Sequence, residues 1–161
     1  MYIYGYHILF LISVAATFGV CGFGLWRGDA PVRYAAASLL AVEISSFILN
    51  PKVGDVGGES AILAVDFAFA VILLMLAVRY ASLWIGAAML LQAVQFSLHS
   101  YYLVMELAHD KLHAWINNID DWGILIAITV GTVLAIRRRA ANAREAAERE
   151  TRRVQRGSPA T

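Results

Sequence analysis

The feature that most constrains this chain is a series of five long apolar stretches separated by short polar breaks. About 20 mostly apolar residues are enough for a helix to cross the hydrocarbon core of a membrane. The sequence therefore predicts an all-α fold, a polytopic membrane bundle of five transmembrane helices within residues 1–136. The predicted spans are 6–26, 32–49, 61–78, 82–107 and 122–136.

Charged residues are few and unevenly placed. Hydrophobic residues make up 60% of the 161-residue chain and charged residues 16%, whereas a soluble domain is about half apolar and about a quarter charged. Residues 137–161 alone hold eight Arg and three Glu. We expect this segment to be a basic cytoplasmic tail, helical and then disordered. Its first residues, Arg137, Arg138 and Arg139, are expected to contact anionic lipid headgroups.

Short polar breaks mark the connections between the predicted helices. Gly28 suits the end of one helix, and Pro31 suits the first turn of the next. Ser60 has the side chain of a helix N-cap and predicts that the third helix begins after it. Arg79 and Tyr80 mark a very short turn before the fourth helix.

The distribution of basic residues predicts the orientation in the membrane. With five spans, Arg27, Arg33 and Arg79 fall on the same side as the C-terminal Arg run. The other side carries two basic residues, Lys52 and Lys111. Because Lys and Arg are enriched in cytoplasmic loops, we expect a multi-pass membrane protein with this arginine-rich side in the cytoplasm. Its N-terminus would lie outside and its C-terminus in the cytoplasm.

A row of polar side chains runs along the fourth predicted span and past its end. Residues spaced alternately by three and four lie on one face of a helix. The helical pattern of this span can be continued to His113, which would place the whole row on one face. The row consists of Gln92, Gln95, His99, Tyr102, Glu106, His109 and His113.

Two carboxylates lie at a similar depth in neighbouring spans. Glu43 and Asp66 are both near the outer ends of their predicted helices. Carboxylates inside a membrane usually face the bundle interior or a water-filled cavity, and chains of Asp, Glu and His can serve as proton relays. A polar cluster that only fixes helix packing explains the pattern equally well. The predicted buried polar cluster is Glu43, Asp66, Gln92, Gln95, His99 and Tyr102.

The outer end of the polar row suggests a divalent metal ion as a cofactor. Glu106, His109 and His113 would put one carboxylate and two imidazoles on adjacent helical turns, a set that suits zinc or a similar ion. Asp110, Asp120 or Asp121 could complete such a shell. Histidines near a helix end are, however, more often plain surface residues.

Haem is a less favoured cofactor. Two helices can supply axial histidines to a haem, and His7 and His99 are the available pair. His7 lies close to the outer end of the first predicted span, so its depth matches that of His99 poorly.

Small residues recur every four positions in the fifth predicted span. Small residues at this spacing let helices approach closely in lipid. Packing within the chain is the simpler expectation, and self-association is the alternative. The predicted helix-packing seam is Gly123, Ala127, Gly131 and Ala135.

The segment from Trp26 to Arg33, which leads into an Ala-rich span, resembles small multi-pass inner-membrane proteins common in alphaproteobacteria. Ala64-Val65-Asp66, His99 and Val130-Gly131-Thr132 before the Arg run fit the same resemblance. It covers most of residues 20–139. That group has no assigned activity, so the resemblance implies an inner-membrane location and no mechanism.

No catalytic motif stands out, which favours a non-enzymatic protein. We expect a structural or accessory subunit whose partners are the lipid bilayer and another membrane protein or a second copy, and no nucleic acid. The alternative is an outward-facing divalent-metal or proton-linked site in a small transporter or sensor. A second alternative is a small pore-forming or lysis-type membrane protein, which the size and basic tail fit.

Overall fold

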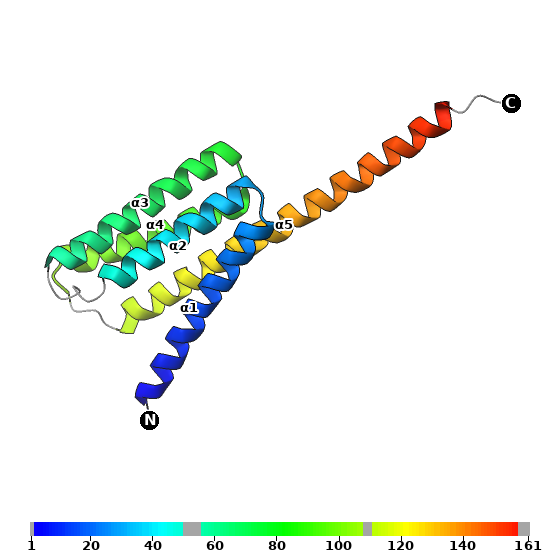
Figure 1. The fold of residues 1–161 in the computed structure, drawn as a ribbon. Helices are drawn as coiled ribbons and strands as arrows, with labels where there is room; N and C mark the ends of the chain where they lie inside the picture. Colours follow the sequence, from blue (N-terminus) through cyan, green and yellow to red (C-terminus); the bar gives the residue numbers. More distant parts are fainter. Residues whose placement is uncertain (1, 50–55, 108–110, 158–161) are drawn as a thin grey trace.

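The computed structural model describes residues 2–49, 56–107 and 111–157, and every element in these ranges is a helix. The predicted all-α fold is confirmed. Figure 1 shows the five helices in chain order. They are α1 (Tyr2–Arg27), α2 (Ala30–Leu49), α3 (Val56–Tyr80), α4 (Leu83–Val104) and α5 (Lys111–Gly157).

The predicted helix boundaries agree to within two residues at one end of the bundle, whereas at the other end only the end of α2, at Leu49, agrees. Pro31 falls in the first turn of α2. The turn predicted at Arg79 and Tyr80 is wrong, because α3 ends at Tyr80 and the connection to α4 is Ala81 and Ser82. The predicted N-cap at Ser60 is wrong, because α3 already begins at Val56. The fifth helix begins at Lys111, well before the predicted start at residue 122. Hydropathy located the apolar part of this helix and missed its polar first turns.

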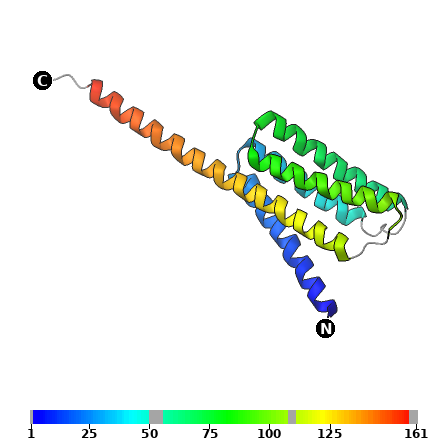
Figure 2. The ribbon, with the colours of Figure 1, turned by 180° about the vertical axis from the view of Figure 1, so that it is seen from behind.

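Helices α2, α3, α4 and α5 form an antiparallel bundle, and α1 packs against α2 and α5. Both ribbon views show α1 diverging from the bundle toward the N-terminus (Figures 1 and 2). Helix α5 runs beyond the bundle as a single rod, so the predicted basic tail continues the fifth helix without a break as far as Gly157. Residues 158–161, predicted to be disordered, lie outside the described ranges.

Three helical segments in the described ranges are long and apolar enough to cross a membrane: Ala30–Leu49, Ser60–Tyr80 and Lys111–Arg153. This number is smaller than the predicted five. The described side chains of α1 form a shorter apolar helix, Leu11–Arg27. Helix α4 has 22 residues, but its glutamines and histidine lower its hydropathy.

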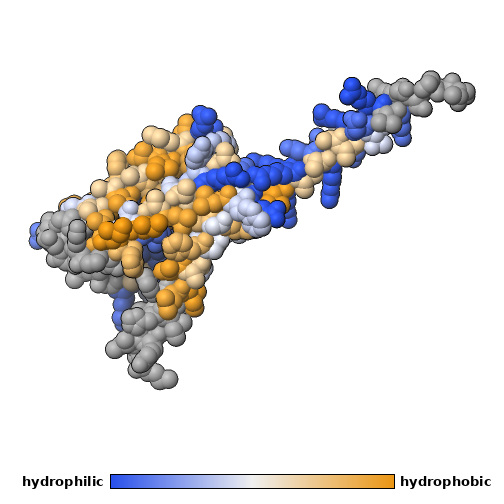
Figure 3. Space-filling view, viewed as in Figure 1, coloured by the Kyte–Doolittle hydropathy of each residue, from blue (hydrophilic) through white to orange (hydrophobic). Residues whose placement is uncertain are grey.

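The face of the bundle seen in the space-filling view is mostly apolar, as its orange atoms show (Figure 3). Leu83 is 94% exposed, Val78 76% and Phe47 72%. Monomeric soluble proteins rarely expose large contiguous apolar patches. The blue atoms of the tail contrast with this surface in the same view.

One end of the bundle, which we call the closed end, contains the α1–α2 and α3–α4 turns and is filled by small and aromatic side chains. A Cβ atom at Gly24 would lie 3.3 Å from Val32 Cγ1 and 3.5 Å from Thr132 Oγ1, so three helices meet there. At Gly28 a Cβ atom would lie 2.3 Å from the carbonyl oxygen of Gly24. Only glycine fits at this turn.

The predicted seam on α5 packs inside the chain. A Cβ atom at Gly131 would lie 2.6 Å from Trp84 Cε2, and one at Gly123 would lie 2.6 Å from Leu91 Cδ1. Ala127 and Ala135 are both buried. The small residues therefore bring α5 close to α4.

Two of the three arginines that begin the tail contact the α1–α2 turn. Arg139 donates hydrogen bonds to the carbonyl oxygens of Arg27 and Gly28, at 3.0 and 2.6 Å. Arg138 Nη1 lies 3.9 Å from Asp29 Oδ2. Arg137 is exposed. The predicted headgroup contacts stay a prediction, and Arg139 has an additional role as a cap for a helix end.

Candidate functional site

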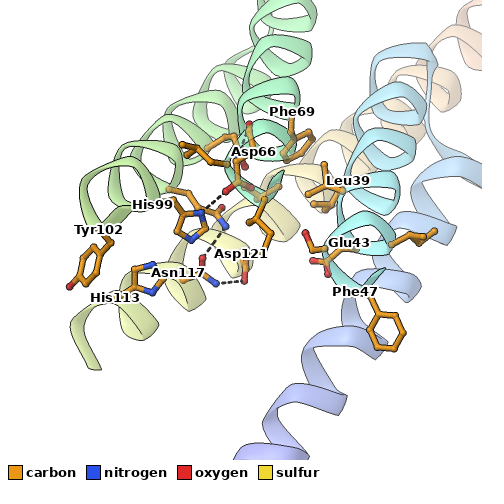
Figure 4. Close-up of a pocket in the computed structure, with 18 of the residues that line it drawn as sticks. Leu39, Glu43, Phe47, Asp66, Phe69, His99, Tyr102, His113, Asn117 and Asp121 are labelled. Carbon is orange, nitrogen blue, oxygen red and sulfur yellow. Dashed lines mark hydrogen bonds and ion pairs between the residues drawn. The ribbon is translucent and has the colours of Figure 1, made fainter. Parts of the chain in front are cut away.

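The opposite end of the bundle, which we call the open end, contains a pocket of about 700 Å³. It lies where α2 ends, α3 begins, α4 ends and α5 begins. Helix α1 contributes Val14 and Phe18 to its lining. Figure 4 shows part of the pocket lining. The polar lining residues come from α2, α3, α4 and α5. These residues are Glu43, Ser46, Asp66, Gln92, Gln95, His99, Tyr102, His113, Asn117 and Asp121.

Helix α4 forms one wall of the pocket. Its polar residues follow the alternating three–four spacing, which places Gln92, Gln95, His99 and Tyr102 on one face, and all four line the pocket. Gln92 is 1% exposed and Gln95 9%. The polar face of α4 is therefore turned into the bundle, and its apolar face is turned outward.

The central polar contact joins α3 and α4. His99 Nδ1 is hydrogen-bonded to Asp66 Oδ2, and the Asp66 residue is only 4% exposed. Gln92 Nε2 donates to the backbone carbonyl oxygen of Asp66 at 3.4 Å. A buried carboxylate is costly unless it is paired, and here the imidazole is its partner. The pair can hold or pass on one proton.

Helix α5 forms the facing wall with residues spaced by four. Gln95 Nε2 donates to Asn117 Oδ1 at 3.0 Å, and Asn117 Nδ2 donates to Asp121 Oδ2 at 3.3 Å. The amide of Asn117 thereby links α4 to the carboxylate of Asp121. Figure 4 shows this chain of contacts beside the Asp66–His99 pair.

His113 closes the pocket near the helix ends. Its ring stacks on His99 with centroids 5.1 Å apart and an interplanar angle of 24°. The Tyr102 ring meets it edge-on at 4.7 Å. The prediction that His113 continues the polar face of α4 is wrong, because α4 ends at Val104 and Glu106 has a left-handed backbone with φ of 51°. His113 belongs to α5 instead, and it packs against the polar face of α4 from there.

Glu43 brings a third carboxylate to the pocket, from α2. In Figure 4 its carboxyl group points into the same space as that of Asp121. Asp66 and Asp121 line the same pocket, so three carboxylates from α2, α3 and α5 share it. No Lys or Arg is among the described residues that line the pocket. The pocket is therefore rich in hydrogen-bond acceptors and has an excess of acidic groups.

The predicted metal set is not assembled in the described part of the chain. Glu106 is exposed, whereas His113 is buried against His99 and Tyr102. His109 lies outside the described residues, so the complete set stays a prediction. Within the described ranges no group of three or more His, Cys, Asp or Glu residues could hold a metal ion. The His7 side chain of the predicted haem pair is also outside the described part.

Sequence reasoning missed Asn117 and considered Asp121 only as a metal ligand. The signal was present, because His113, Asn117 and Asp121 are spaced by four and so share a helix face. Asp120, next to them, is 3% exposed, and its Oδ2 has no hydrogen-bond partner among the described residues. Its side chain is not part of the pocket lining.

Comparison of the chain with models of protein families, with curated proteins and with solved structures gives no match.

Proposed function

We propose that this chain is an integral membrane protein with five spans, a small transporter or sensor whose polar pocket opens to the outside. The observation that carries the proposal is the pocket itself, in which Asp66, His99 and two further carboxylates share one cavity of about 700 Å³. Ionisable side chains within a membrane usually face a pathway or a binding site. Pockets of this volume accommodate small molecules.

The packing of the helices supports a count of five spans. Helix α4 packs between α3 and α5, two of the three strongest candidates for membrane spans. Its 22 residues are about 33 Å long at helical rise, close to the hydrocarbon thickness of a bilayer. The polar face of α4 lies against the pocket, so its apolar face would contact the lipid. Helix α1 has 26 residues and joins α2 through a tight turn, which supports a further span.

The arginines support the proposed orientation. Arg27, Arg33 and Arg79 all lie near the closed end, as does the Arg run in α5. Basic residues favour the cytoplasmic side. In a bacterial-type inner membrane the closed end would therefore face the cytoplasm, and the pocket would lie in the outer half of the membrane.

The pocket supports a proton-linked site better than it supports an accessory subunit. The accessory role rested partly on the small residues of α5, and Gly123 and Gly131 are covered by Leu91 and Trp84 of the same chain. A pore-forming role has less support, because the closed end is filled by side chains. The Asp66–His99 pair gives the pocket a group that can exchange a proton when a ligand binds.

Cysteine accessibility in intact cells tests the proposal. In a Cys21→Ala background, a single cysteine is introduced by Ser46→Cys, which lies on the pocket wall. We expect this cysteine to react with a membrane-impermeant thiol reagent added from outside. Ser38→Cys, two turns along α2 toward the closed end, is the matched control and should stay unreactive. Asn142→Cys on the tail should react only after the cells are permeabilised.

Two outcomes would overturn the proposal. Reaction of Asn142→Cys from outside would reverse the orientation. An unreactive Ser46→Cys, beside a tail cysteine that behaves as expected, would mean that the pocket is closed to the outside.

A further inference from the structure

We propose that the pocket takes a protonated amine attached to an apolar body, which reaches the site from the outer leaflet of the membrane. This inference rests on the proposed function and names the ligand class of the same site. Three features of the pocket support it. The polar wall is acidic, the rest of the lining is apolar, and exposed apolar residues of α1 and α2 border the pocket.

The charge of the pocket selects a cation. Glu43, Asp66 and Asp121 come from three different helices, and no described lining residue is a Lys or Arg. Asp66 is already bonded to His99. Glu43 has no hydrogen-bond or ion-pair partner among the described residues, and Asp121 receives one amide hydrogen bond, from Asn117. These two carboxylates are therefore available to a donor-rich cation, whereas an anion would be repelled.

The low dielectric of the site strengthens this selection. The energy of two charges at contact distance rises severalfold between water and a partly buried site. Carboxylates within a membrane are costly without a partner. A ligand ammonium group between Glu43 and Asp121 would remove that cost, because it donates hydrogen bonds to both.

The rest of the lining is apolar and suits a hydrocarbon or aromatic body. Phe69 is 1% exposed and packs beside Leu39 at the inner part of the pocket. Phe18 comes from α1 and Phe47 from α2. Aromatic faces also attract ammonium groups. A small inorganic cation would leave this apolar surface unused.

Exposed apolar residues in the pocket lining indicate the route by which a ligand enters. Phe18 is 51% exposed, Ile44 50% and Phe47 72%, although all three line the pocket. Phe18 belongs to α1, whereas Ile44 and Phe47 belong to α2, so accessible apolar side chains border the pocket at these two helices. An apolar body can therefore enter from the lipid while its amine reaches the carboxylates. A phospholipid with an amine headgroup fits less well, since its phosphate would approach the same carboxylates.

The experiment measures protection of Ser46→Cys by defined amphiphiles. The Cys21→Ala/Ser46→Cys protein is reconstituted in nanodiscs, and its labelling rate is measured with increasing decylamine. Decan-1-ol and decanoate serve as the neutral and anionic probes with the same tail. Lys111→Cys, exposed at the same end of the bundle, reports any change in surface potential caused by the probes. We expect decylamine alone to slow Ser46→Cys labelling without slowing Lys111→Cys.

A charge-removing variant separates binding from partitioning. Adding Glu43→Gln and Asp121→Asn removes both carboxylates that would bind the amine. We expect the decylamine concentration needed for half-protection to rise about tenfold or more, which corresponds to about 1.4 kcal/mol of binding free energy. Glu106→Gln removes an exposed carboxylate outside the pocket lining and is the matched control; it should change nothing. Melting curves of all variants verify that the fold is intact.

Equal protection by decan-1-ol, stronger protection by decanoate, or protection that survives the double substitution would overturn the inference. In any of these cases, labelling of Ser46→Cys from outside would still support the outward-facing pocket. The ligand class and the proposed function therefore fail separately.

Discussion

The closed and open ends of the bundle are built from the same helices and differ in how their interiors are filled. At the closed end, glycines and alanines bring the helices together around Trp84 and Val32. At the open end, residues from all five helices line a cavity of about 700 Å³ whose walls carry three carboxylates and two imidazoles. The filled closed end gains dispersion contacts between its side chains. The side chains that line the cavity at the open end lack such contacts on one side.

This difference indicates where stability and where function reside. A cavity in a bundle interior lowers stability, since the surrounding side chains lose contacts. Polar groups away from water add a further cost unless they are paired. A chain that needed the open end only for packing would fill it with apolar side chains. Four experiments, each with an internal comparison or a control variant, test this division.

The largest effect is expected for Gly131→Leu at the closed end. A Cβ atom alone would already lie 2.6 Å from the Trp84 ring, and overpacking of this kind costs about 3 kcal/mol or more. Gly22→Leu is the control, because no atom lies within 4 Å of a Cβ atom there. Size-exclusion profiles and melting curves in detergent should show loss of folded protein for Gly131→Leu alone. Equal behaviour of the two variants would contradict tight packing at the closed end.

Two valines of α2 compare the two ends directly. Val32 is 1% exposed at the closed end, whereas Val42 lines the pocket. Val32→Phe should lower the free energy of unfolding by about 2 kcal/mol. Val42→Phe should leave it unchanged or raise it, because the ring has space to occupy, while decylamine protection is weakened. Destabilisation by Val42→Phe as large as that by Val32→Phe would mean that the pocket is not a usable space.

The Asp66–His99 pair is expected to be energetically coupled. A double-mutant cycle with Asp66→Asn and His99→Gln should give a coupling energy of about 1 to 2 kcal/mol, in the range found for residues in one network. Ser97→Ala, on the exposed side of α4, is a control outside this network. Chemical unfolding of the four proteins provides the measurement. Additive effects of the two substitutions would show that the pair contributes no mutual stabilisation.

The smallest effect is expected for Arg139→Gln. It removes the charge-assisted hydrogen bonds to the carbonyls of Arg27 and Gly28, and the exposed setting limits the loss to about 1 kcal/mol. Arg144→Gln is the matched control on the exposed tail. The melting temperature should fall by a few degrees for Arg139→Gln and stay constant for the control. Identical melting temperatures would mean that the cap on α1 adds nothing.

The features that could be predicted from sequence are those set within a single helix. The apolar stretches predict the five helices, and the three–four spacing predicts that Gln92, Gln95 and His99 share a face of α4. The helix ends near the pocket could not be predicted in this way. Residues after Val104 continue the polar spacing, yet Glu106 adopts a left-handed backbone and ends the helix. The three–four spacing predicts a shared face only within a continuous helix, and α4 ends at Val104.

The beginning of α5 was missed for a related reason. Hydropathy begins the fifth apolar stretch at Trp122, and Lys111, His113 and Asn117 are too polar to extend it. In the fold these turns of α5 are helical because they pack against α4, where Asn117 bonds Gln95 and His113 stacks on His99. Tertiary contacts stabilise helical turns that propensity and hydropathy leave open.

By itself, the sequence determined that the chain is helical and apolar, that its arginines gather near one end, and that α4 has a polar face. The tertiary structure alone decided that Asp121 and His113 join Glu43 and that face around one cavity, and that the small residues of α5 are used inside the chain. Helical periodicity sets which residues share a side of one helix. Which helix that side meets depends on how all five pack together, because each close approach at a glycine sets the separation of the helices elsewhere.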